Sequence, residues 1–218
     1  MNYVLRVPLQ TSATQSARLQ ELQKAFAQVC NALAPVAQRT ACWNRVALHH
    51  MAYKQLRQQF PGLGSQMVCN AIYSVSRACR HVYQHPQSRF NVQRLGGRPL
   101  PRLQFQSKAP VYFDRHTLSL KDGKVSMFTL DGRMRFNLAL AAADEQRFRN
   151  EKLREIVLTS HGDAFRLSFF FAPALGDEDA ELASGARAEL PEYVLVTEDN
   201  APALPLPALP ALNAHSIP

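Results

Sequence analysis

The feature of this chain that could do chemistry is a long stretch that carries positive charge and no negative charge. Residues 22–113 contain no aspartate or glutamate, but they contain 12 lysines and arginines. Ordinary helical surfaces mix both signs, because opposite charges three or four residues apart stabilise a helix. A surface of one sign repels itself, so it is typical of proteins that bind an anionic partner. The pattern therefore predicts contact with nucleic acid, whose phosphates form a dense line of negative charge.

Two predicted helices in this stretch combine basic and aromatic side chains on one side. Tyr73, Arg77 and Arg80 recur at helical spacing, opposite an apolar stripe from Val68 to Val82. A merely solvated face would show the same spacing, but the absence of acids nearby favours contact with phosphates or bases. We expect replacement of Arg77 and Arg80 by glutamate to change folding little. The residues of these helices predicted to bind nucleic acid are Arg45, His49, Tyr53, Lys54, Arg57, Tyr73, Arg77 and Arg80.

Patterns typical of catalysis or metal binding are missing from the sequence. The four cysteines include no Cys-x-x-Cys pair, and we expect Cys69 and Cys79 to be core thiols. The adjacent His49 and His50 have no third metal ligand at a suitable spacing. The glycine loop at residues 93–99 lacks the Gly-Lys-Ser/Thr end of a phosphate-binding loop, and no Gly-x-Ser-x-Gly motif occurs. We therefore predict no catalytic residue, no metal site and no cofactor.

The elements that must position these residues follow from hydrophobic periodicity. The sequence predicts one strand and then three helices, at residues 3–9, 12–35, 44–60 and 64–84. The first helix begins with a capping box between Ser12 and Gln15 and is expected to end near Pro35. The basic and aromatic stripes fall on the second and third helices.

From Pro101 onward the period changes to two, which predicts strands. The predicted strands and one short helix are residues 103–105, 111–113, 117–120, 125–130, 134–138, 142–148 (the helix), 155–159 and 165–171. Asp122-Gly123 and Asp131-Gly132 are tight hairpin turns. The first strand needs a sheet, and only these later strands offer one. The predicted fold class is therefore α+β, an antiparallel, OB-like β-barrel with a three-helix insertion after its first strand.

The predicted organisation separates a basic body from an acidic tail. Residues 1–10 and 99–171 form the barrel, residues 11–98 the helical lobe and residues 172–218 the tail. The body up to residue 171 has a net charge of +15, and the tail has −7. The tail becomes rich in proline, alanine and leucine, so we predict it to be mostly disordered and dispensable for folding, with residues 193–196 as its one possible strand. It is either a solvated linker or a competitor for the polyanion site.

Targeting signals are not evident in the sequence. The N-terminus lacks the apolar core of a signal peptide, and no run of about 18 apolar residues occurs. The cysteines do not demand an oxidising compartment. We therefore predict a cytoplasmic protein with no membrane partner.

Part of the sequence is similar to a known family. Phe113–Leu120 and Val125–Met134 resemble the wedge domain of TnpB-type proteins, which are transposon-encoded RNA-guided nucleases, and of their relatives, the type V CRISPR effectors. Asn44–His50 and Pro61–Gln66 resemble the helical recognition lobe of the same proteins. The order of strand, helical insertion and barrel over residues 1–171 is also similar to their N-terminal half.

The resemblance implies a role in holding nucleic acid. In that family the wedge and recognition lobes hold a guide RNA and its heteroduplex with target DNA, while base pairing reads the sequence. It implies that this chain is RNA-binding, with a guide-like structured RNA as partner and target DNA as a further, DNA-binding partner. The resemblance adds six residues to the predicted nucleic-acid-binding set: Arg94, Arg98, Arg102, Arg115, Arg133 and Arg135.

The chain departs from the family where cleavage would be expected. TnpB-type proteins cut DNA with a RuvC-like domain whose carboxylates hold metal ions. Residues 194–199 lie about where its first catalytic strand would fall, but they lack its flanking glycines, and no further carboxylate follows. We therefore predict a nuclease-deficient binding module that is not an enzyme. The alternatives are an RNA-binding subunit of a split nuclease, whose RuvC-like half is a separate chain, and a truncated transposon remnant.

Overall fold

The first strand of the chain joins a sheet with the last hairpin of the body, as the sequence predicts. The computed structural model describes residues 3–121, 123–172 and 192–197. β1 (Tyr3–Leu9) pairs antiparallel with β8 (Ala164–Ala172) over all seven residues of β1. β8 pairs on its other side with β7 (Lys152–His161), which pairs with β3 (Val111–Phe113). This four-stranded sheet therefore unites the start and the end of the body.

The remaining strands form two further antiparallel sheets. β4 (Leu118–Lys121), β5 (Lys124–Thr129) and β6 (Gly132–Asn137) make a meander. β2 (Arg102–Phe105) pairs with β9 (Val194–Thr197). The fold class is α+β with antiparallel sheets, as predicted, but the strands of the described residues form three sheets and no closed barrel.

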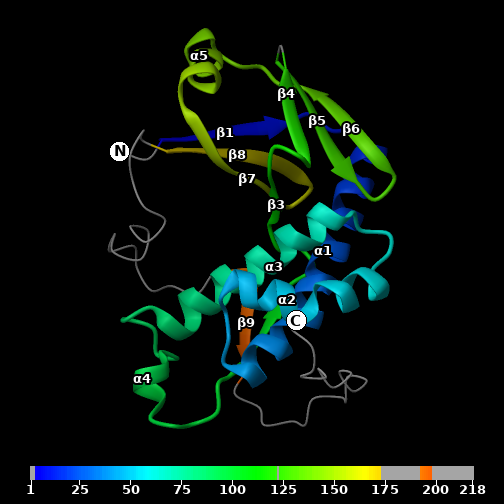
Figure 1. Cartoon of the computed structure of the whole chain (residues 1–218). Coiled ribbons are helices and arrows are strands. Elements are labelled where there is room, and N and C mark those ends of the chain that lie inside the picture. The colour runs from blue at the N-terminus through cyan, green and yellow to red at the C-terminus, as the bar shows by residue number, and fades with distance from the viewer. Residues whose placement is uncertain (1–2, 122, 173–191, 198–218) are drawn as a thin grey trace, which may run out of the picture.

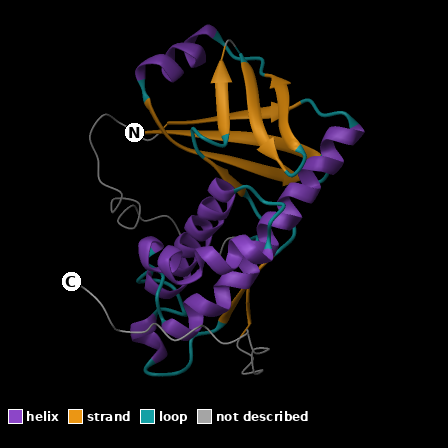
Figure 2. Cartoon of the chain, turned by 45° about the vertical axis from the view of Figure 1, so that its right-hand side comes forward, coloured by secondary structure: helices purple, strands orange, loops and turns teal. Residues whose placement is uncertain are grey.

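Side-chain packing joins the meander to the four-stranded sheet. Val125, Met127 and Phe136 of the meander belong to the same hydrophobic core as Leu5 and Val7 of β1. Figures 1 and 2 show the meander lying across the four-stranded sheet. The closed barrel that we predicted is not formed by the described strands, because alternation predicts which face of a strand is buried but not which strand lies beside it.

The first helix, α1 (Ala13–Thr40), begins where the sequence predicts and extends further. Ser12 caps it in the expected capping box. Pro35 lies inside the helix rather than at its end, although a proline there removes a backbone hydrogen bond. The helix continues because its last turns bury Ala34 and Ala37 in the core, and that packing outweighs the lost hydrogen bond.

α1 runs along both halves of the molecule and connects them (Figure 1). Near its start, the Arg18 guanidinium donates to the Thr129 hydroxyl of β5 at 2.9 Å. Further along, the Asn31 side chain donates to the backbone carbonyl of Phe105 in β2 and accepts from its N–H. The helix therefore fixes the position of the helical lobe relative to the sheets.

The helical lobe is built from α2 (Arg45–Gln59) and α3 (Ser65–Cys79), which pack on each other and on α1. Asn44 caps α2 as predicted, because its side chain accepts from two N–H groups of the first turn. A π-helical turn, η1 (Arg80–Gln84), continues α3 to the predicted end. A short helix, α4 (Val92–Leu95), overlaps the start of the predicted glycine loop at residues 93–99.

The last helix, α5 (Ala142–Asn150), packs against the four-stranded sheet and covers aromatic residues of β8. The ring of Phe148 lies edge-on to Phe169 and Phe171, with centroids 5.0 Å from each. The helix that the sequence predicts at 142–148 is therefore confirmed. Among the described residues, no helix combines the length and apolarity needed to cross a membrane.

The part of the predicted tail that the structure describes is a strand, β9, where the sequence allowed one. Val194 is 4% exposed and belongs to the core. The backbone N–H of Gln106, the residue after β2, donates to the backbone carbonyl of Tyr193 at 2.9 Å. We therefore revise the expectation that the whole tail is dispensable for folding. The predicted disorder at residues 173–191 and 198–218 lies outside the described residues.

Candidate nucleic-acid interface

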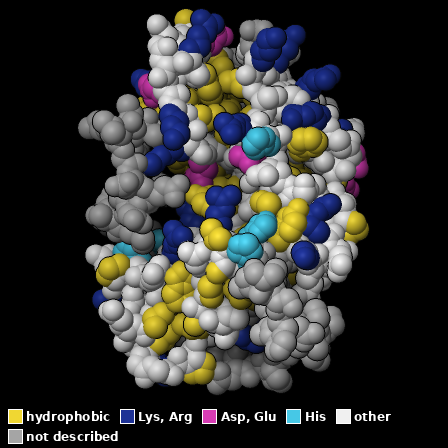
Figure 3. Space-filling view, in the orientation of Figure 1, with side chains coloured by type: hydrophobic (Ala, Val, Ile, Leu, Met, Phe, Trp, Pro, Cys, Tyr) yellow, Lys and Arg dark blue, Asp and Glu magenta, His cyan; other side chains and the backbone are white. Residues whose placement is uncertain are grey.

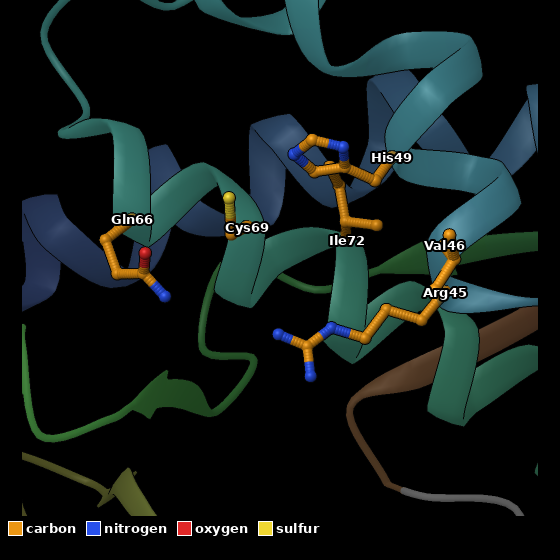
Figure 4. Close-up of a pocket in the computed structure, with 6 residues that line it drawn as sticks. All are labelled: Arg45, Val46, His49, Gln66, Cys69 and Ile72. Carbon is orange, nitrogen blue, oxygen red and sulfur yellow. The ribbon is translucent and has the colours of Figure 1, made fainter.

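α2 and α3 line an open pocket of about 310 Å³ on the surface of the helical lobe. Figure 4 shows side chains of both helices around it. α2 contributes the first three lining residues and α3 the other three: Arg45, Val46, His49, Gln66, Cys69 and Ile72. The lining combines a cation, an imidazole, an amide and apolar groups. Such a lining offers hydrogen-bond donors and apolar contacts to the same ligand.

Aromatic rings support the basic side chains of the pocket. Asn44 sets the first turn of α2, and Arg45 lies over the Tyr73 ring of α3, with its guanidinium carbon 5.2 Å from the ring centroid. His49 stacks on Tyr53 one turn further along, with ring centroids 4.5 Å apart and 18° between the planes. Such pairs orient a planar group while its N–H donors still reach a ligand. The structure thus brings together four of the residues predicted from spacing.

The Asp114 carboxylate lies beside the pocket and is held by its neighbours. Gln66 donates its amide to Asp114, and the Thr117 hydroxyl and the His116 backbone N–H donate at 2.9 and 3.0 Å. Burial by itself would raise the pKa of Asp114, but these hydrogen bonds outweigh burial and lower the pKa below its ordinary value. The first acid after the acid-free segment therefore stabilises a turn.

The thiols near the pocket are not activated nucleophiles. Burial raises the pKa of Cys69, and the opposing effect of Arg45 is weaker. Burial raises the pKa of Cys30 and of Cys79 to about 12. Cys79 is a core thiol as predicted, whereas Cys69 is half-buried and lines the pocket. Within the described residues no group of three or more metal-ligating side chains occurs.

Arg77 has a different environment from the one that its spacing predicts. Its guanidinium donates to both carboxylate oxygens of Glu155 at 2.7 Å, and its carbon lies 5.9 Å from the centroid of the Tyr112 ring. Glu155 follows a β-bulge at Arg154 in β7, a device that redirects a side chain. The hydroxyls of Tyr112 and Tyr193 are hydrogen-bonded to each other. We call Arg77, Tyr112, Glu155 and Tyr193 the Arg77 junction.

The Arg77 junction corrects the assumption that no acid lies near this stripe. Residues 22–113 are free of acids, but β7 brings Glu155 into contact with Arg77 from 78 positions away. Arg80 is half-buried in the π-helical turn. The expectation that glutamate at position 77 leaves folding unchanged is therefore revised, because it would place two carboxylates together.

The other predicted residues lie in separate places. Lys54 is exposed on α2, whereas Arg57 donates to the backbone carbonyl of Leu63. Exposed residues around α4 and β2 are Arg94, Arg98 and Arg102. Exposed residues on or beside the meander are Arg115, Arg133 and Arg135. Figure 1 shows α4 and the meander at opposite ends of the molecule, so no single surface holds the whole predicted set.

Most lysines and arginines of the acid-free segment have no carboxylate partner among the described residues. Among the residues that the structure describes, Arg77 is the one lysine or arginine of residues 22–113 that forms a salt bridge. The salt bridges Arg18–Asp131 and Arg147–Glu151 lie outside this segment. Figure 3 shows Lys and Arg side chains at both the sheet end and the helical end of one face. Exposed cations that have no carboxylate partner favour contact with an anion.

Sequence reasoning missed some residues that the structure brings forward. Gln66 and Cys69 line the pocket, and no pattern in the sequence distinguishes them from other helix residues. Phe128 is also missed, although it is exposed and lies under Arg133, with 4.3 Å between the guanidinium carbon and the ring centroid. A signal for Phe128 exists, because it shares the outward period-two face of its strand with Lys124.

Comparison with known proteins does not identify a family for the chain. No family model matches it, and no curated protein matches it. The functional interpretation of the interface therefore depends on its geometry and its charge.

Proposed function

We propose that this protein binds structured RNA through α2, α3 and the loop around α4, and that it does not cleave nucleic acid by itself. One observation carries the proposal: of the 12 lysines and arginines in residues 22–113, Arg77 alone has a carboxylate partner among the described residues. Cations without counterions repel one another, so a polyanion stabilises a surface that carries many of them. Phosphates supply that charge at regular spacing.

The pocket supports a ligand that has unpaired bases as well as phosphates. Arg45 and His49 present planar groups that lie against Tyr73 and Tyr53, and Val46 is 63% exposed beside them. An unpaired base can enter such a pocket. The bases of a regular duplex cannot, because they are stacked in the interior of the duplex. Structured RNA presents unpaired bases in loops and bulges, where proteins recognise them by stacking.

The family resemblance supports a more specific version of the proposal. The order of first strand, three-helix insertion and later strands is the one that the resemblance to TnpB-type proteins implies, so the three sheets together would be the counterpart of the wedge domain and the helices that of the recognition lobe. The ligand is then a guide-like RNA, with target DNA as a second ligand and a separate RuvC-like chain as the source of cleavage. Metal-dependent cleavage by the purified chain alone would contradict this version.

The test neutralises exposed cations of the interface and compares them with an equal change of charge elsewhere. The interface variant carries Lys54→Gln, Arg94→Gln and Arg98→Gln. The control variant carries Arg6→Gln, Arg149→Gln and Arg166→Gln, all exposed and outside the acid-free segment. Both variants lose three charges, so any general loss of attraction is the same in each. Because the replaced side chains are exposed, the free energy of unfolding should stay within about 0.5 kcal/mol of wild type.

The measurement is the affinity for a structured RNA as a function of salt concentration. Each lost phosphate contact lowers the slope of log K against log salt by about 0.7–0.9. The slope of the interface variant should therefore fall by about two units, and the control variant should keep the wild-type slope. Equal slopes in the two variants would contradict the position of the interface. An affinity that does not change with salt would contradict nucleic-acid binding itself.

A further inference from the structure

The meander has an outward face that the proposed function does not use. Alternate residues of β4, β5 and β6 point away from the core, and they include four cations and one aromatic ring. We call this surface the outer meander face, and it consists of Lys121, Lys124, Phe128, Arg133 and Arg135, with Ser119, Ser126 and Asn137 between them. The intervening positions, such as Met127 and Met134, are buried.

The strand register places like charges opposite each other on this face. Lys121 of β4 pairs directly with Lys124 of β5, and both are exposed. Arg135 of β6 lies opposite Ser126, in the next outward row. Like charges directly opposite each other destabilise a sheet. The fold gains no stability from this arrangement, and a ligand with negative charge would remove the repulsion.

The aromatic ring lies at the other end of the same face. Phe128 is 40% exposed and pairs across the ladder with Arg133. The Arg133 guanidinium covers part of the ring, and it also donates to the backbone carbonyls of Ser126 at 2.9 Å and of His116 at 3.3 Å. These contacts hold the guanidinium plane in place. A fixed pair of a ring and a guanidinium offers a base planar groups on which to stack.

Acidic side chains of the described residues are absent from this face. Asp131, in the turn after β5, is paired with Arg18 of α1 at 3.4 Å. Asp114, before β4, is held by Gln66 and its own turn. Asp122, between β4 and β5, lies outside the described residues. The charge of the outer meander face is therefore complementary to a phosphate chain.

We propose that the outer meander face binds a single-stranded stretch of nucleic acid. One base stacks on the Phe128–Arg133 pair, and neighbouring phosphates contact Lys124, Lys121 and Arg135. The distance along β5 from Phe128 to Lys124 is about 14 Å, at about 3.4 Å per residue, which accommodates a few extended nucleotides. The inference rests on the proposed function for the class of ligand, and it adds a second surface that discriminates a single strand from a duplex.

The test compares the binding of a single-stranded RNA with that of the blunt duplex of the same sequence, by fluorescence anisotropy. Phe128→Ala should weaken single-strand binding about 5- to 150-fold, because one stacked base is lost, and should leave duplex binding unchanged. Phe128→Trp keeps a ring and should retain the affinity. Leu195→Ala removes an apolar side chain of similar exposure, 48%, from β9 and should change neither affinity.

A second variant keeps the test valid if Phe128→Ala folds poorly. Lys121→Glu replaces the repulsion with Lys124 by attraction, so it should be at least as stable as wild type, and it should weaken single-strand binding more at low salt than at high salt. If folded Phe128→Ala and Lys121→Glu bind the single strand as wild type does, this surface is not the site and the proposed function stands. If wild type binds neither the single strand nor structured RNA, both proposals are overturned.

Discussion

Arg45 and Arg77 lie on neighbouring helices of the same acid-free segment, but their surroundings are opposite in kind. Arg77 is held by Glu155 and lies against Tyr112, at the place where α3 meets the four-stranded sheet. Arg45 is exposed, lies over Tyr73 and has no carboxylate partner among the described residues. Spacing along a helix therefore does not decide whether a basic residue is structural or available for a ligand. The deciding factor is whether a strand packed against that turn of the helix brings a carboxylate to it.

The two regions also differ in what a substitution costs. The Arg77 junction holds a charge that is partly removed from water, and breaking such a pair leaves the partner uncompensated. The pocket around Arg45 is open to solvent, where substitutions usually change the free energy of unfolding little. Measurements of stability and of RNA affinity should therefore separate the two regions.

The largest effect is expected from Arg77→Glu, which places two carboxylates together in the Arg77 junction. We expect the free energy of unfolding to fall by about 3 kcal/mol, as measured by urea denaturation. The value is at the low end for buried pairs, because the Arg77 side chain is 37% exposed and solvent screens its charge. The double variant Arg77→Glu/Glu155→Arg should recover part of the loss, and a failure to recover any would argue against the pairing.

A slightly smaller effect is expected from removing residues 192–218, which takes β9 and Tyr193 from the same junction. The loss of buried Val194 and of the hydrogen bond between Tyr193 and Tyr112 should lower the free energy of unfolding by about 2–3 kcal/mol. Thermal and urea unfolding would measure this loss. A chain that ends after residue 197 is the control, since it keeps the strand and should keep wild-type stability. Equal stability of the two chains would show that β9 contributes nothing.

The smallest change in stability is expected from Arg45→Gln, because Arg45 lies in the pocket that is open to solvent. Loss of an exposed cation–aromatic pair should cost at most about 1 kcal/mol. The same variant should bind structured RNA more weakly, with a salt slope lower by about 0.7–0.9. Denaturation and binding titrations on one protein preparation check both outcomes. An unchanged affinity would show that Arg45 does not contact RNA, and the proposed contrast between a ligand-binding Arg45 and a structural Arg77 would then be wrong.

Local signals in the sequence predicted most element boundaries. The capping box at Ser12 and the cap at Asn44 form as expected, because their hydrogen bonds join residues only two or three positions apart. Pro35 misled the prediction, since burial of the neighbouring alanines outweighs the helix-breaking effect of proline. The described strands form three antiparallel sheets rather than the predicted closed barrel for the same kind of reason, because the partner of a strand is chosen by packing across the whole fold.

The sequence by itself determined that a long stretch of this protein would carry unbalanced positive charge, and which faces of its helices and strands would be buried. Those properties follow from residue type and from spacing along one element. Only the tertiary structure decided that Glu155 would neutralise Arg77, that β9 would pair with β2, and that the Arg133 guanidinium would lie over the Phe128 ring. These contacts join segments or strands that meet only on folding, and packing of the whole core selects them rather than any local preference.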